Sequence, residues 1–242
     1  MMQALRDYYR GQMFRPGLAG LLVNPFYFAR KGLYDAIQEL SAGVAGKLLD
    51  VGCGSRPYER LFAATEYVGL ELDTPENRAR GLADVYYDGA ALPFATASFD
   101  AIVCNQVLEH VFEPDRFLGE MRRVLRPGGR MLLSVPFAWD EHEQPRDFAR
   151  YSSFGLAALL RKSGFEILEH RKTMPDARAV FQLVNAYLFK VTATGNKYVD
   201  LGVALLLMAP VNIAGTALSR VTPANPDLYL DNVVLAARAD GK

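Results

Sequence analysis

The residue types and spacing that most clearly suggest chemistry start at Asp50, immediately before a turn that contains Gly52 and Gly54. Glycine lets backbone N–H groups approach a ligand closely, and a helix N-terminus after such a turn favours negative charge. A nicotinamide dinucleotide would call for a third glycine, in the pattern Gly-x-Gly-x-x-Gly, but Pro57 occupies that position. The turn therefore predicts a small-molecule site other than a nicotinamide site.

Asp50 indicates what kind of ligand this turn would suit. A carboxylate here would repel a pyrophosphate and would favour a cofactor that carries an ammonium group. S-adenosylmethionine carries one, together with a sulfonium cation. We therefore expect Asp50, Gly52, Cys53 and Gly54 to belong to a cofactor site.

A second group of chemically active residue types lies at 135–151. His142 is the residue in this segment whose side chain exchanges a proton near neutral pH, so it is the candidate general base; its other interpretation is a structural role in the loop. Arg146, Arg150 and Tyr151 would either bind an anionic substrate or anchor the loop, and Trp139 is a further candidate for substrate binding.

The elements that must position these residues alternate between strands and helices. Short apolar runs predict strands at 47–51, 67–71, 83–87, 100–105, 130–135, 165–169 and 229–237. Helical periodicity predicts helices at 26–40, 114–125 and 156–162, and Pro127-Gly128-Gly129 should end the second of these. This alternation predicts a parallel sheet with helices on both faces, and it places both chemical groups at the carboxyl ends of strands.

Six blocks in chain order resemble the class I S-adenosylmethionine-dependent methyltransferases, specifically the type 11 small-molecule branch. They are Leu49-Asp50-Val51-Gly52-Cys53-Gly54, Tyr67-Val68-Gly69-Leu70-Glu71-Leu72-Asp73, Asp88-Gly89 with Leu92-Pro93-Phe94, Ser98-Phe99-Asp100, Val107-Leu108-Glu109-His110-Val111 and Arg123-Val124-Leu125-Arg126-Pro127-Gly128-Gly129. One departure is Arg56, which stands where the family often has a third glycine.

The resemblance implies a Rossmann-like sheet of seven strands, with the last strand antiparallel. It also implies roles for residues at the strand ends. Glu71 would accept from the ribose hydroxyls, with Asp73 as the alternative, and Asp88 with Gly89 would hold the adenine edge. Asn105 and Gln106 would lie beneath the methionine part of the cofactor.

The pattern His-x-x-Pro-x-Asp-x-x-Arg-Tyr that starts at His142 resembles a subgroup of these enzymes that modifies polysaccharides, glycolipids or other small molecules. The resemblance therefore implies methyl transfer to a small-molecule or lipid- or sugar-linked acceptor, most simply at oxygen. Three alternatives stay open: C- or N-methylation of a quinone-like or other small metabolite, an inactive cofactor-binding scaffold, and a nicotinamide oxidoreductase, which Asp50 and Pro57 oppose.

The expected domain organisation is an N-terminal helical cap (1–45) and a methyltransferase domain (46–242) that includes a helical insertion (174–227). The insertion holds two apolar stretches, at 179–191 and 199–218, but Asp200, Pro210 and Asn212 interrupt the second. We expect the insertion to supply extra core or a homodimer interface, a lid over the substrate pocket, or a surface that contacts a membrane.

Composition limits the remaining possibilities. The chain of 242 residues has 27 basic and 27 acidic side chains, so its net charge of zero opposes a broad nucleic-acid-binding surface. Its two cysteines, Cys53 and Cys104, make no metal cluster, and we expect both to be buried thiols in a reducing compartment. The first 15 residues have no continuous apolar core, so we expect no signal peptide and a cytoplasmic protein, with peripheral contact at the inner face of the membrane as an option.

Overall fold

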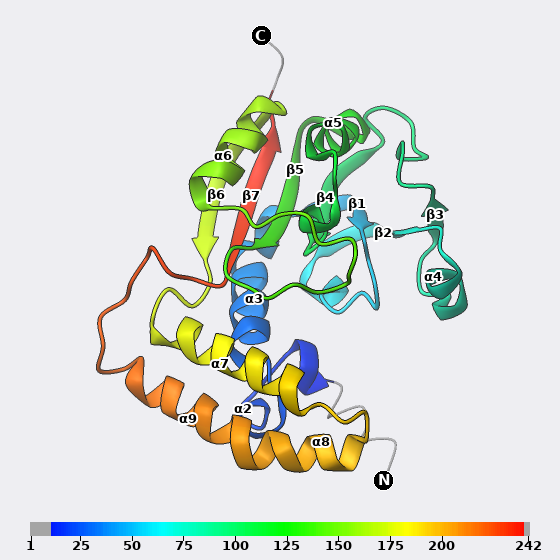
Figure 1. Ribbon diagram of the computed structural model, residues 1–242. Helices are drawn as coiled ribbons and strands as arrows, with labels where there is room; N and C mark the ends of the chain where they lie inside the picture. Colours follow the sequence, from blue (N-terminus) through cyan, green and yellow to red (C-terminus); the bar gives the residue numbers. More distant parts are fainter. Residues whose placement is uncertain (1–10, 240–242) are drawn as a thin grey trace. The chain divides into compact units, whose positions relative to one another are not determined.

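The computed structural model describes residues 11–239 (Figure 1). These residues divide into two compact units: a sheet unit (36–137, 141–171 and 232–239) and a helical unit (11–35, 138–140 and 172–231). The first ten residues of the expected N-terminal cap lie outside the described residues.

The sheet unit holds seven strands in the order β3-β2-β1-β4-β5-β7-β6. They are β1 (Ala45–Val51), β2 (Ala63–Leu72), β3 (Val85–Tyr87), β4 (Phe99–Asn105), β5 (Leu125–Pro136), β6 (Phe165–Lys172) and β7 (Asp231–Arg238). The pairs β1–β2, β1–β4, β2–β3 and β4–β5 are parallel, whereas β7 runs opposite to its neighbours (Figure 1). The expected seven-stranded Rossmann-like sheet is therefore confirmed.

Helices cover this sheet and have clear sequence signals at their starts. They include α4 (Pro75–Arg80), α5 (Pro114–Val124) and α6 (Ser153–Lys162), with 3-10 turns η1 (Ser41–Gly43), η2 (Glu59–Leu61) and η3 (Leu108–His110). Pro at the first turn starts α5, and Ser152 caps α6 by accepting from the Gly155 N–H. The apolar face of α5 is buried against a core that includes Leu49, Ile102 and Leu133.

The strand β5 begins earlier than its sequence pattern predicts. The predicted strand was 130–135, with Pro127-Gly128-Gly129 as a helix stop. The helix does end at Val124, but β5 starts at Leu125, and its register against β4 shifts between Phe99 and Ala101. Residues 126–128 are exposed, so the Pro-Gly-Gly segment forms an irregularity within the strand.

The helical unit is built from two parts of the sequence that lie far apart. It contains α2 (Gly20–Val23), most of α3 (Tyr27–Leu40), α7 (Ala177–Thr192), α8 (Lys197–Val203), the π-helical turn η4 (Ala204–Met208) and α9 (Ala209–Leu218). Tyr27, Phe28, Met174, Ala179 and Leu230 form its apolar core. The observed units therefore differ from the expected cap and insertion, because residues 11–35 and 174–227 share this core and pack as one unit.

Candidate active site

A pocket of about 590 Å³ opens in the sheet unit where β1, β2 and β4 end. Its volume lies in the usual range for small-molecule sites. The pocket is lined by residues of the turns after β1 and β3, of β2 and α4, and of the segments after β4 and β5. These residues include Gly52, Gly54, Glu71, Asn77, Gly89, Gln106, His110, Glu143, Arg146 and Phe148. The pocket thus brings together five of the predicted cofactor residues and one predicted substrate residue.

The turn after β1 requires glycine. Gly52 has φ +71°, and a Cβ atom built there would lie 2.4 Å from Val107 Cγ2, so any side chain would clash. Gly54 has φ +50°, and its N–H donates to Glu71 Oε1 at 2.7 Å. Two strand ends are thereby tied together at the wall of the pocket.

Arg56 occupies the position where relatives often have glycine, and its backbone keeps the glycine-like conformation, with φ +52°. Its side chain is fixed by an ion pair with Asp84 at 2.8 Å and by donation from Nε to the Leu82 carbonyl at 3.0 Å. These bonds offset the cost of a left-handed conformation in a residue with a Cβ atom. The departure from the family pattern therefore leaves the shape of the turn intact.

Glu71 lies at the centre of this wall. Besides accepting from Gly54, it accepts from Asn77 Nδ2 through Oε2 at 3.2 Å. Asp73, the alternative for the same role, is instead held by Arg78 through two hydrogen bonds of 2.7 and 2.8 Å. The geometry thus favours Glu71 over Asp73 as the acid that faces the pocket.

Asp50 and Cys53 lie beneath the turn and do not line the pocket. Asp50 is 6% exposed and accepts from the Tyr67 hydroxyl at 2.6 Å. Burial raises the pKa of Asp50 to about 7, and burial also raises the pKa of the Cys53 thiol to about 12. Cys104 is buried as well, as the sequence predicts.

The remaining predicted cofactor residues lie at the ends of β3 and β4. Asp88 is exposed and accepts from the Ala90 N–H at 2.8 Å, which shapes the Asp88-Gly89 turn. Asn105 accepts from the Ser134 hydroxyl, and Gln106, with φ +57°, donates from Nε2 to that same hydroxyl at 3.2 Å. Gly89 and Gln106 line the pocket, whereas Asp88 and Asn105 do not.

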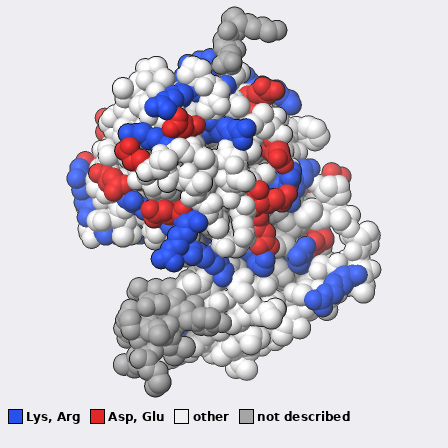
Figure 2. Space-filling model, turned by 180° about the vertical axis from the view of Figure 1, so that it is seen from behind, with Lys and Arg blue, Asp and Glu red and all other residues white. Residues whose placement is uncertain are grey.

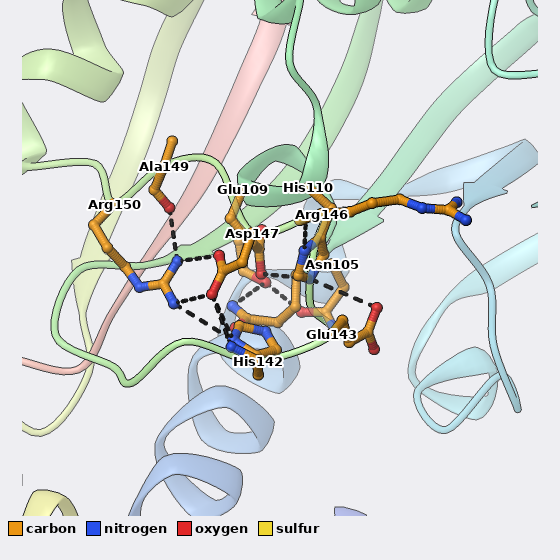
Figure 3. A network of polar contacts seen from close by, with 11 residues as sticks. Asn105, Glu109, His110, His142, Glu143, Arg146, Asp147, Ala149 and Arg150 are labelled. Atoms are coloured by element: carbon orange, nitrogen blue, oxygen red, sulfur yellow. Dashed lines mark hydrogen bonds and ion pairs between the residues drawn. The ribbon is translucent and has the colours of Figure 1, made fainter.

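The segment after β5 holds His142 in a network of charged groups (Figure 3). Asp147 Oδ2 accepts from the His142 backbone N–H at 2.9 Å and lies 3.3 Å from its Nδ1. Arg150 donates to both carboxylate oxygens of Asp147 at 2.6 Å and holds the pKa of that carboxyl at about 2. A carboxylate in this position orients the imidazole, and Arg150 Nη2 lies 3.4 Å from the same Nδ1 atom of His142.

A second histidine meets this network from the turn η3. The rings of His110 and His142 pack edge to face with centroids 4.8 Å apart. Glu109, His110 and His142 each have one side-chain atom that could bind a metal ion, and these three atoms lie within 4.8 Å of one another. Glu109 is fully buried. His110 Nδ1 lies 2.7 Å from the Arg146 carbonyl, and the Phe148 N–H donates to the Glu109 carbonyl at 2.9 Å, so the loop is tied to η3.

The predicted substrate residues separate in the structure. Arg146 lines the pocket, Arg150 is engaged by Asp147, and Tyr151 packs against the core of the sheet unit. Trp139 belongs to the helical unit, where its ring lies 5.8 Å from that of Phe26.

Sequence reasoning missed Asn77 and Asp147 and did not include Glu109 or His110 in the site. The signal for Asp147 was present, because it is the aspartate of the His-x-x-Pro-x-Asp pattern. Asn77 belongs to a short polar helix with no apolar periodicity, so no pattern pointed to it.

Comparison with known proteins identifies the domain that carries this pocket. Residues 49–133 match the family model of the type 11 methyltransferases, described as a methyltransferase domain. A probable S-adenosylmethionine-dependent methyltransferase of Mycolicibacterium smegmatis is 32% identical over 164 residues, which cover 62% of this chain and 63% of that protein. An uncharacterised methyltransferase of Mycobacterium marinum is 44% identical over 123 residues, which cover 47% and 45%.

The domain belongs to the class I S-adenosylmethionine-dependent methyltransferases, type 11. S-adenosylmethionine is the cofactor of this family of domains, and methyl transfer is the reaction for which its curated relatives are named. The chain spans less than two thirds of the length of the curated relatives it matches, so the shared part is the methyltransferase domain rather than the whole of either protein.

Solved structures with the same fold have diverse activities. The crystal structure of the (4+2)-cyclase SpnF is 24% identical, with a TM-score of 0.55, and the match covers 86% of this chain and 80% of that one. Phosphoethanolamine N-methyltransferase 2 of Haemonchus contortus, solved with S-adenosyl-L-methionine, is 17% identical, with a TM-score of 0.55, and the match covers 96% and 60%. At this identity the likeness shows the fold of the methyltransferase domain and nothing about its acceptor.

Proposed function

We propose that this protein transfers a methyl group from S-adenosylmethionine to the oxygen of a small-molecule or lipid- or sugar-linked acceptor. The observation that carries the cofactor assignment is the Glu71 carboxylate at the pocket wall, between the Gly54 N–H and the Asn77 amide. A carboxylate so placed can accept from two vicinal hydroxyls, as a ribose presents them.

The cofactor would be held by the ends of four strands. Backbone groups at Gly52 and Gly54 would meet the methionine tail, Glu71 the ribose, and Gly89 with the Asp88-shaped turn the adenine edge. Asp50 would contribute through the shape of the turn that follows it, because its side chain is held there by the Tyr67 hydroxyl. Asn105 and Gln106 would support the sulfonium end from β4, and Cys53 would hold the turn through its buried side chain.

S-adenosylmethionine supplies a methyl group on a sulfonium that leaves as a neutral thioether. The protein's own task is to hold the acceptor oxygen in line with that methyl group and to receive the hydroxyl proton. We assign proton removal to His142, which Asp147 orients and which packs against the pocket-lining His110. Of the four predicted substrate residues, we assign contact with an anionic part of the acceptor to Arg146, because it lines the pocket. Arg150 positions Asp147, and Trp139 and Tyr151 remain proposals for acceptor contacts.

Two other functions predict different results in the same assays. C- or N-methylation would use the same cofactor residues with a different acceptor, and the fold is also used by an N-methyltransferase and a cyclase. An inactive scaffold would bind the cofactor and modify no acceptor.

The test combines binding and turnover. Calorimetry should detect S-adenosylmethionine and its demethylated product with micromolar affinity and no binding of nicotinamide dinucleotides. Glu71→Ala should weaken S-adenosylmethionine binding about ten- to a hundred-fold, because a charged hydrogen-bond acceptor contributes about 1.5–3 kcal/mol. Asp73→Ala is the matched control, since Asp73 is already held by Arg78.

A screen of acceptors with methyl-labelled cofactor then addresses the reaction. Label on an oxygen of a small or lipid-linked acceptor supports the proposal, and label on nitrogen or carbon replaces it with one of the alternatives. Binding of a nicotinamide cofactor in place of S-adenosylmethionine, or an unchanged affinity in Glu71→Ala, would contradict the assignment of the site.

A further inference from the structure

The helical unit turns apolar side chains outward. On α7 the exposed residues Val180, Val184, Tyr187 and Val191 follow each other at intervals of four, three and four positions, so they form one stripe along the helix. In the part of the helical unit visible in Figure 2, most of the surface is uncharged.

The run from α8 to α9 continues this pattern. Leu205, Leu206, Leu207, Ile213 and Leu218 are exposed, and no charged residue occurs from 201 to 218. Within the described residues, Lys197–Leu218 is the one helix long and apolar enough to cross a membrane by length and composition, and 28% of its most apolar window is buried. Most residues of that window are therefore not buried.

Polar side chains, in contrast, are turned inward. Gln182 and Asn185 on α7 and Asn212 on α9 are buried. Asn185 Nδ2 donates to Asn212 Oδ1 at 2.9 Å, and Asn212 Nδ2 donates to the carbonyls of Leu21 and Asn24 at 3.0 and 3.1 Å. Gln182 accepts from the Phe28 N–H at 3.0 Å and donates to the Pro25 carbonyl at the same distance. Amide hydrogen bonds, rather than apolar contacts alone, thus connect α7, α9 and the N-terminal helices.

This placement of apolar and polar side chains is the reverse of the one expected for helices in water. A helix in water buries its apolar stripe and exposes polar groups, whereas lipid removes the cost of exposed apolar side chains and makes hydrogen-bonded amides the contacts between helices. We propose that the outer face of α7, α8 and α9 docks into the interface of a lipid bilayer and makes the protein a peripheral membrane enzyme, in the cytoplasm at the inner face of the membrane.

The lengths of the helices indicate docking in one leaflet. Both ends of the insertion join neighbouring strands, β6 and β7, so the hairpin leaves and re-enters the same sheet. A spanning hairpin would need two helices that each cross about 30 Å of hydrocarbon. The 16 residues of α7 reach about 24 Å, so this hairpin lies in the interface instead of crossing it.

Residues near the turn between α7 and α8 also favour contact with a lipid bilayer. Tyr187 and Tyr198 are exposed, and Lys197 Nζ lies 4.9 Å from the centre of the Tyr198 ring, whereas Lys190 forms an ion pair with Asp140 at 2.9 Å. Tyrosine and lysine are the residues that anchor helices at the level of lipid headgroups, with apolar stems in the acyl region and polar ends in water. The core of a homodimer interface is depleted in lysine, so these residues favour lipid over a second copy of the chain.

The experiment uses the full chain and vesicles of phosphatidylcholine with phosphatidylglycerol. We expect a monomer in analytical ultracentrifugation that sediments with the vesicles. Leu206→Glu changes a side chain that is 78% exposed, so folding should be unaffected and the bound fraction should fall at least about tenfold, because charge in the acyl region is costly. Phe154→Glu is the matched control, since Phe154 is 86% exposed on α6 of the sheet unit and should leave vesicle binding unchanged.

Each other outcome overturns the proposal in its own way. A concentration-dependent dimer that Leu206→Glu dissociates, without vesicle binding, would make the same face a homodimer interface. A monomer indifferent to vesicles would make it an inert exposed surface, and equal losses in both variants would mean that binding is not confined to this face. Vesicle sedimentation is measured without S-adenosylmethionine and cofactor binding without vesicles, so this proposal and the proposed function can fail separately.

Discussion

His142 shows how a side chain's role depends on what holds it. His142 lies on an irregular loop, which by itself gives its side chain little rigidity. Asp147 Oδ2 accepts from the His142 backbone N–H and lies close to its Nδ1 atom, and Arg150 fixes Asp147 in turn. Because these partners hold the imidazole in place, it can receive a proton from the acceptor at a defined position.

If His142 receives the acceptor proton, His142→Ala should lower kcat by about 10²–10⁴ with the affinity for S-adenosylmethionine unchanged. Asp147→Asn should lower kcat less, because the imidazole remains but loses its orienting charge. Steady-state kinetics and calorimetry separate these effects, and added imidazole should partly restore the His142→Ala variant. His170→Ala is the control, since His170 bonds to Asn232 within the sheet. Full turnover with an unchanged pH profile in His142→Ala would leave His142 a structural residue of the loop.

Asp50 leads to a prediction about pH. Its pKa is raised to about 7 in the folded state by burial, against 3.8 for an unperturbed aspartate. Protonated Asp50 therefore stabilises the fold below about pH 4, and this contribution is lost as pH rises through 7, by up to about 1.4 kcal/mol per pH unit.

Asp50→Asn keeps an oxygen that can accept from Tyr67 but cannot ionise. Relative to wild type, its free energy of unfolding should rise between pH 4 and pH 8, as denaturant titrations without cofactor would measure. Asp73→Asn should show no such trend over this range, because the hydrogen bonds from Arg78 lower the pKa of Asp73 and its titration therefore lies below pH 4. A pH-independent difference between Asp50→Asn and wild type would contradict the buried, raised pKa.

At the scale of the elements, the sequence predicts well those with a strong hydrophobic periodicity or with a glycine that the backbone conformation requires. The predicted strands 47–51, 67–71 and 100–105 fall inside β1, β2 and β4. The apolar runs of β1 and β4 are buried on both faces of the sheet, and Leu70 of β2 is fully buried. The helix 114–125 is correct to one residue, since its apolar face and starting proline agree.

The elements that sequence predicts poorly are those fixed by contacts distant in sequence. The Arg56 turn depends on Asp84 and Leu82, which no local pattern announces. Likewise, the short helix α4 has no buried residue, and only its Thr74 cap and Pro75 mark its start. The site thus follows from sequence where backbone conformation decides it, as at Gly52, and not where side-chain partners do, as at Asp147.

At the scale of the whole molecule, the two units hold themselves together by different means. The sheet unit has a continuous apolar core, whereas the helical unit combines a small apolar cluster with buried amides that join residues 11–35 to 172–231. An expected cap and an expected insertion are therefore one structure, because Gln182 and Asn212 bond to backbone carbonyls of the N-terminal segment. Sequence patterns could not reveal this, since polar residues within apolar helices appear as interruptions.

The amide network gives the last prediction. Asn212→Ala would remove a partner from the Leu21 and Asn24 carbonyls and from the Asn185 amide. The Asn24 carbonyl keeps the Tyr27 N–H and the Asn185 amide keeps the Met208 carbonyl, so the cost of about 1–3 kcal/mol comes chiefly from the Leu21 carbonyl. Hydrogen exchange should therefore accelerate in α2, α7 and α9, while β1 and β4 keep their protection and the affinity for S-adenosylmethionine stays at the wild-type value.

Thr222→Ala is the control, because Thr222 is only half-buried and its hydroxyl donates to the Leu218 carbonyl within its own turn. Faster exchange across both units in Asn212→Ala would mean that they unfold together, and unchanged exchange would mean that the network adds nothing to the stability of the helical unit. Acceleration confined to α2, α7 and α9 would establish that the buried amides stabilise the helical unit separately from the sheet unit.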